Sequence, residues 1–122
     1  MPHVAIAGPV TPESIWLAFG PAEFMEKGTI FKAEEAYLSA DRTTLLVRGL
    51  TVERGFRKLF FLRILAREEG GVTVSLDAVN RPAMSDAVKR LVGLYAWHII
   101  RHSEGCEVAT TNLHGLVIGP QT

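Results

Sequence analysis

The stretch AMSDAVKRLVGLYAWHIIRH, residues 83–102, carries the strongest periodic pattern of the chain. At about 100° per residue, one face of a helix built from it collects Met84, Val88, Leu91, Tyr95, His98 and His102. Ala87, Val92 and Ile99 widen that face, whereas Lys89 and Arg90 fall to its sides. The pattern predicts one long amphipathic helix over residues 83–103 that buries this face against the rest of the protein.

The residues before this helix are typical of antiparallel strands. Residues 43–52 are β-prone, and residues 56–67 alternate so that Phe60, Leu62 and Ile64 share one face. Residues 72–78 alternate in the same way after the turn at Gly70-Gly71. Short links between successive strands indicate an antiparallel meander.

Two segments leave alternatives open. Residues 29–40 contain good helix formers, yet Phe31, Ala33, Glu35 and Tyr37 also alternate. We favour a strand that enters a hairpin at Asp41-Arg42. Residues 107–118 form either a final strand or a loosely ordered tail.

The first thirty residues predict small elements. Residues 3–7 form a short strand, and Thr11-Pro12-Glu13-Ser14 is typical of a helix start, because Thr11 can cap and Pro12 suits the first helical position. This helix would end at Gly20-Pro21. Residues 22–27 are predicted to add another helical turn, ended by Gly28.

Together these elements predict one α+β domain over residues 1–122. A curved antiparallel sheet carries a short N-terminal helix, and the long helix packs across one face of the sheet. The order "HVAIAG", "TPESIWLAFGPAEF", a meander over 29–79 and a helix from Ala83 resembles the helix-grip arrangement of the START and Bet v 1-like superfamily. The resemblance implies a sheet closed by the helix and carries over no functional residue.

Composition and net charge argue against some classes of function. Thirteen basic and thirteen acidic side chains give a formal net charge of zero, which provides no general attraction to nucleic acid or anionic membranes. Zero net charge also favours self-association, so a homodimer is expected. Cys106 is the single cysteine, and the first ten residues lack the pattern of a signal peptide. We therefore expect a cytoplasmic protein.

The predicted buried helix face changes character along its length. It is aliphatic near Val88 and Leu91 but polar and aromatic at Tyr95, His98 and His102. Buried polar groups need partners, so this end predicts a cavity. Our first hypothesis is a domain that binds a small apolar or amphipathic molecule between the sheet and the helix. Phe60 and Leu62 would line the sheet side of the cavity, and no cofactor is expected.

Alternative chemistries have less support. His98 and His102 have the i, i+4 spacing that can present two imidazoles to one metal ion, but the other ligands are missing, so no metal site is predicted. A cysteine nucleophile at Cys106 lacks an orienting group. A small enzyme could use His98, His102 or a buried carboxylate such as Glu35, and its catalytic residues remain unknown.

A non-enzymatic, homo-oligomeric interaction protein is the second hypothesis. Trp97 on the far side of the helix and arginine-rich strands favour it. The cationic residues concentrated in mid-chain are Arg48, Arg54, Arg57, Lys58, Arg63 and Arg67. Nucleic-acid binding is not expected, because Glu53, Glu68 and Glu69 dilute them and the net charge is zero.

Overall fold

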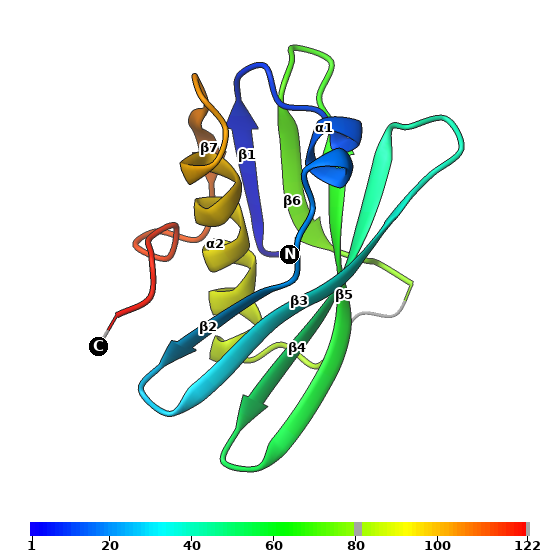
Figure 1. Ribbon diagram of the computed structural model, residues 1–122. Helices are drawn as coiled ribbons and strands as arrows, with labels where there is room; N and C mark the ends of the chain where they lie inside the picture. The colour runs from blue at the N-terminus through cyan, green and yellow to red at the C-terminus, as the bar shows by residue number, and fades with distance from the viewer. Residues whose placement is uncertain (80–81, 122) are drawn as a thin grey trace.

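A computed structural model describes residues 1–79 and 82–121. Its antiparallel sheet curls around one side of a helix, with a second, short helix near the rim (Figure 1). The order of strands in the sheet is β2-β3-β4-β5-β6-β1-β7. Along the chain the elements are β1 (His3–Ala7), α1 (Pro12–Leu17), β2 (Ala22–Glu26), β3 (Thr29–Leu38), β4 (Thr44–Glu53), β5 (Phe56–Ala66), β6 (Val72–Leu76), α2 (Asp86–Arg101) and β7 (Glu107–Thr111).

The structure confirms the α+β class and the antiparallel meander. Strands β3 to β6 pair with their neighbours in chain order, and Gly49 of β4 lies opposite Phe60 of β5. A side chain at Gly49 would meet Leu91 Cδ2 at 3.0 Å, so this glycine lets α2 approach the sheet closely. The inward faces of the strands and α2 form one hydrophobic core.

The ambiguous segment at residues 29–40 is a strand, but its predicted alternation is wrong. The pairing of β3 with β4 shifts register between Ala33 and Glu35. Phe31 and Ala33 are buried, whereas Glu35 and Tyr37 are exposed on the opposite face. A bulge of this kind reverses which alternate residues face the core.

Two predicted helical features are corrected. Residues 22–27 are not a helical turn: β2 pairs along its whole length with β3, through a turn in which Lys27 and Gly28 have positive φ angles. The helix predicted over 83–103 is shorter, with 16 residues. It begins after Ser85, whose hydroxyl accepts from the Val88 N–H, and it ends before His102. Met84 and His102, at the two ends of the predicted buried face, are exposed.

The C-terminal segment is both a strand and an ordered tail. β7 pairs with β1, and the chain then returns across the side of α2 that faces away from the sheet (Figure 1). Backbone contact is close there: a Cβ on Gly93 of α2 would lie 2.2 Å from the Leu116 carbonyl oxygen. Residues 113–121 form this C-terminal tail. α2 is therefore covered on two sides, which explains why most of its residues are buried.

Arg90 holds the C-terminal tail in place. Its guanidinium forms a bidentate pair with Glu26 at the end of β2, with both N···O distances 2.9 Å. It also donates to the carbonyl oxygens of Leu116, Ile118 and Gly119, at 2.7, 3.2 and 2.8 Å. The periodic pattern placed Arg90 beside the buried face, but the tail covers it and leaves it only 7% exposed.

Trp97 also lies on the side of α2 that the C-terminal tail covers. It packs against the core, its ring lies 6.3 Å from that of Phe24, and the Arg101 guanidinium stacks over it at 5.1 Å. Gly119 of the tail lies so close that a side chain there would collide with the Trp97 ring. The chain itself thus covers part of the indole.

In the ranges 1–79 and 82–121, no helix is both long enough and apolar enough to cross a membrane.

Candidate functional site: a pocket between the two helices

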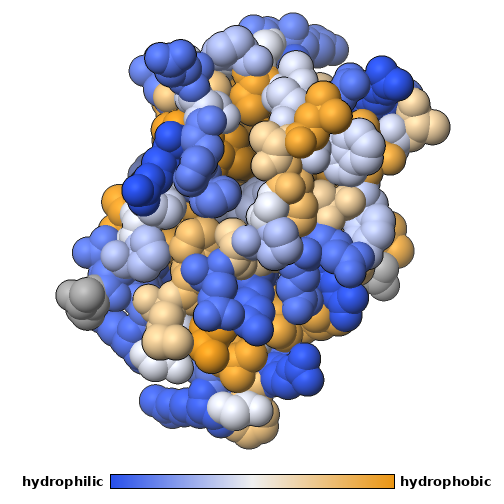
Figure 2. All heavy atoms as spheres, viewed as in Figure 1, coloured by the Kyte–Doolittle hydropathy of each residue, from blue (hydrophilic) through white to orange (hydrophobic). Residues whose placement is uncertain are grey.

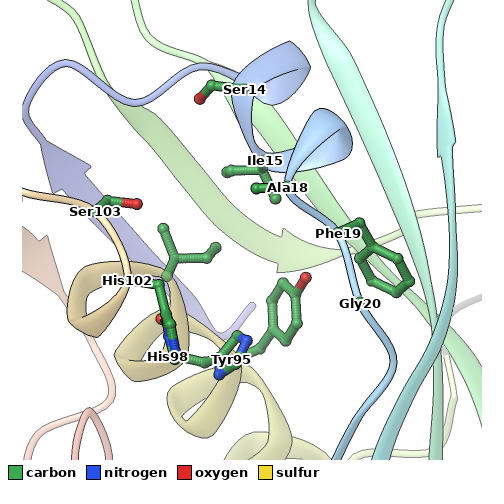
Figure 3. A pocket seen from close by; sticks show the side chains of 10 residues that line it. Ser14, Ile15, Ala18, Phe19, Gly20, Tyr95, His98, His102 and Ser103 are labelled. Atoms are coloured by element: carbon green, nitrogen blue, oxygen red, sulfur yellow. The ribbon is translucent and has the colours of Figure 1, made fainter.

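A pocket of about 220 Å³ opens between α1 and the C-terminal half of α2 (Figure 3). Its lining side chains come from these two helices and the residues that follow them: Ser14, Ile15, Ala18, Phe19, Gly20, Tyr95, His98, Ile99, His102 and Ser103. The two walls are far apart in sequence, so the pocket exists only because the fold brings α1 over α2.

Local chemistry holds the α1 wall in position. Thr11 caps the helix by accepting from the Ser14 N–H at 3.0 Å, and Ser14 Oγ accepts from the Thr11 N–H at 2.9 Å. Pro12 occupies the first turn, and Ile15 is buried in the core. The predicted helix start is thereby confirmed. This anchoring places Ala18 and Phe19 above the pocket, as Figure 3 shows.

The α2 wall brings together three residues that the sequence singled out. Tyr95, His98 and His102 follow one another along the helix, with ring-centroid distances of 5.7 Å between Tyr95 and His98 and 4.4 Å between the two histidines. The Tyr95 hydroxyl points into the space below α1 (Figure 3). In the part of the chain that the structure describes, no group forms a hydrogen bond with this hydroxyl.

Phe60 and Leu62 lie elsewhere. Both are almost completely buried in the core, and neither lines the pocket. The middle of the sheet–helix interface, where the sequence placed a cavity, is filled by side chains from both layers. The α1 residues of the pocket were missed, because the local pattern of α1 predicts a helix but not the surface on which that helix packs.

Burial shapes the ionisation of the pocket. Burial lowers the pKa of His98, and the positive charges of His102 and Arg101 lower it further. Burial also raises the pKa of the Tyr95 hydroxyl. Both side chains are therefore uncharged near neutral pH. The lining contains no aspartate, glutamate, lysine or arginine, so the pocket is polar without carrying a fixed charge.

His98 and His102 are not joined by further side chains that could bind a metal ion, among the residues that the structure describes. His102 Nδ1 lies 2.9 Å from the His98 carbonyl oxygen. This ring nitrogen is therefore already in contact with the last turn of α2. Among residues 1–79 and 82–121, no group of three or more histidine, cysteine, aspartate or glutamate side chains is placed to hold a metal ion. Cys106 instead packs against Gly8, where a Cβ would lie 2.7 Å from its sulfur.

The other candidate side chains are spread over the surface. Glu35 is exposed and accepts a hydrogen bond from Tyr37. Arg67 binds the Ile6 and Gly70 carbonyl oxygens and Glu69, while Lys58 donates to the Ala83 carbonyl oxygen. Arg67 and Lys58 therefore make separate contacts and do not meet at one site. Figure 2 shows hydrophilic and hydrophobic residues interspersed over the face in view.

No protein-family model matches the chain, and comparison with curated proteins and with solved structures also found no match.

Proposed function

We propose that this protein binds a small, mostly apolar molecule in the pocket between α1 and α2. The observation that carries the proposal is the Tyr95 hydroxyl, which points into the pocket and has no hydrogen-bonding partner in the described chain. Tyr95 as a whole is only 3% exposed. The hydroxyl opens onto the pocket, so a bound molecule or a water there can supply the partner that a tyrosine hydroxyl usually has.

The size of the pocket limits the ligand. An apolar cavity of about 150 Å³ is sufficient for benzene. A pocket of about 220 Å³ therefore suits a single substituted ring or a short branched chain. Ile15, Phe19 and Ile99 provide apolar contact, and polar atoms gather at the α2 wall. This proposal keeps the Tyr95 end of the predicted cavity and replaces its sheet wall with α1.

A steric test uses two neighbouring residues at the C-terminal end of α1, Leu17 and the C-cap residue Ala18. Ala18→Trp places a large side chain in the lining, whereas Leu17→Trp adds the same side chain at a residue that is 71% exposed and does not line the pocket. We expect toluene to shift the NMR signals of the Tyr95 region in the wild type and in Leu17→Trp, with at least ~10-fold weaker binding in Ala18→Trp.

Two results would contradict the proposal. One is the absence of any toluene-dependent shift near Tyr95 in the wild type at millimolar probe. The other is equal affinity in Ala18→Trp and Leu17→Trp while both variants keep the wild-type unfolding midpoint.

A second candidate function is self-association through the outer face of the sheet, the face turned away from α2. Tyr37, Leu59 and Leu65 are exposed there, at 47, 51 and 37%. The pairing of β3 and β4 places Glu35 beside Arg48, so the same surface carries both signs of charge. A face that combines apolar area with both signs of charge can be complementary to a second copy of itself across a twofold axis. We propose a homodimer formed in this way.

Light scattering tests the dimer. We expect the wild type to have twice the chain mass of 13.4 kDa at high concentration, and Leu59→Lys to have the single-chain mass, because the new charge would be buried at the interface. Leu17→Lys, on the exposed side of α1, is the matched control and should remain dimeric. A wild type that stays monomeric up to millimolar concentration would exclude this candidate.

A further inference from the structure

We infer that the ligand of the pocket carries an uncharged hydroxyl group that donates a hydrogen bond to the α2 wall, as a phenol does, and not a carboxylate. The inference rests on the proposed function of the pocket and specifies its ligand class. It depends on which hydrogen-bonding atoms the wall offers and on the charge around them.

The geometry of His102 assigns its tautomer. Its Nδ1 lies 2.9 Å from the His98 carbonyl oxygen, and a carbonyl oxygen can only accept, so Nδ1 carries the hydrogen. In the neutral ring, Nε2 is then an acceptor. His102 lines the pocket and therefore brings an acceptor to it.

His98 adds a second acceptor. Its ring forms no hydrogen bond with any group in the described chain, and its neighbours are the rings of Phe24, Tyr95 and His102. The charged or titratable groups near it are Tyr95, Arg101 and His102, all on α2, while α1 and β2 contribute apolar contacts and no charge. A neutral imidazole presents one nitrogen lone pair and one N–H. A ligand hydroxyl can both donate to the lone pair and accept from the N–H, whereas a carboxylate can only accept and leaves the lone pair without a partner.

The position of the wall at the end of α2 also disfavours an anion. The last turn of a helix has free carbonyl groups and a partial negative charge. Tyr95, His98 and His102 occupy the last two turns of α2 and its C-cap position. No lysine or arginine lines the pocket to offset the desolvation of a carboxylate. Arg101 is turned toward Trp97 instead.

The experiment compares three probes of similar size by NMR titration: toluene, phenol and benzoate. At pH 8 we expect phenol to bind about 3- to 10-fold more tightly than toluene, the gain typical of one net hydrogen bond, and benzoate to bind most weakly. The pH is then lowered until the NMR signals of the His98 ring show that it is protonated; phenol should lose this advantage there, because protonation removes the acceptor of His98. Toluene should be unaffected by the change.

A variant separates His98 from other titrating groups. In His98→Gln the side-chain amide oxygen still accepts a hydrogen bond but does not titrate. This variant should keep the preference for phenol at pH 8 and lose the part of the pH dependence that follows the protonation of His98. Benzoate binding more tightly than phenol at pH 8, or a phenol affinity that is the same before and after protonation of His98, would overturn the inference. Those results would leave the proposed function intact, whereas failure of toluene to bind would remove both.

Discussion

Arg90→Ala is expected to lower the free energy of unfolding by about 3–5 kcal/mol, the range for removing one partner of a buried ion pair. The substitution leaves the Glu26 carboxylate, whose side chain is 14% exposed, without its cation. It also removes the donor for three carbonyl oxygens of the C-terminal tail. Urea denaturation measures the loss, and Lys89→Ala, the neighbouring half-buried cation of α2, serves as the control with a change near zero.

The same pair gives the stability an acid dependence. The hydrogen bonds from Arg90 lower the pKa of Glu26 below its usual 4.5, although burial opposes the shift. A lowered folded-state pKa means that the stabilisation is complete above about pH 4.5 and is lost as the pH falls through the folded-state value. We expect Glu26→Gln to flatten this part of the stability profile. If Arg90→Ala costs no more than Lys89→Ala, the guanidinium does not fasten the tail.

Gly93→Ala is expected to destabilise the protein by about 1–3 kcal/mol, the usual range for overpacking. In an ordinary helix the same substitution would stabilise by roughly 1 kcal/mol, because alanine has the higher helix propensity. Here the new Cβ would lie 2.2 Å from the Leu116 carbonyl oxygen and 3.0 Å from the Leu116 Cβ. The backbone of α2 or of the C-terminal tail must move to relieve this contact. The steric cost therefore outweighs the gain in helix propensity.

Limited proteolysis distinguishes this cause from a general loss of stability. We expect the C-terminal tail of Gly93→Ala to be cut faster than that of the wild type under native conditions, because the tail must separate from α2. Gly20→Ala is the control: no atom lies within 4 Å of its Cβ, so its unfolding midpoint and cleavage rate should match the wild type. A more stable Gly93→Ala protein with a protected tail would show that Leu116 can shift at little cost.

Several elements of the fold could be predicted from the sequence. The strands β4, β5 and β6 and the helix α2 follow from periods of two and of about 3.6 residues, and the start of α1 follows from its cap. The same local information misassigned residues 22–27, because strand β2 is stabilised by its pairing with β3 and not by its own residues. Tertiary context decided that element.

Part of the candidate site could also be predicted from the sequence, and part could not. Tyr95, His98 and His102 could be selected in advance, since polar side chains on an otherwise apolar helix face need partners. Their actual neighbours, Ala18 and Phe19, could not be selected, because nothing in the local pattern of α1 reports which surface it packs on. Phe60 and Leu62 were chosen for facing the helix, and they do so as core residues.

The sequence by itself determined the element types with strong periodicity and the polar end of α2. Only the tertiary structure decided that the C-terminal tail covers the second side of α2, that Arg90 is buried, and that α1 completes the pocket. Periodicity records how one segment divides its own residues between two faces. The identity of what covers each face depends on contacts between distant segments, and those are determined by the packing of the whole chain.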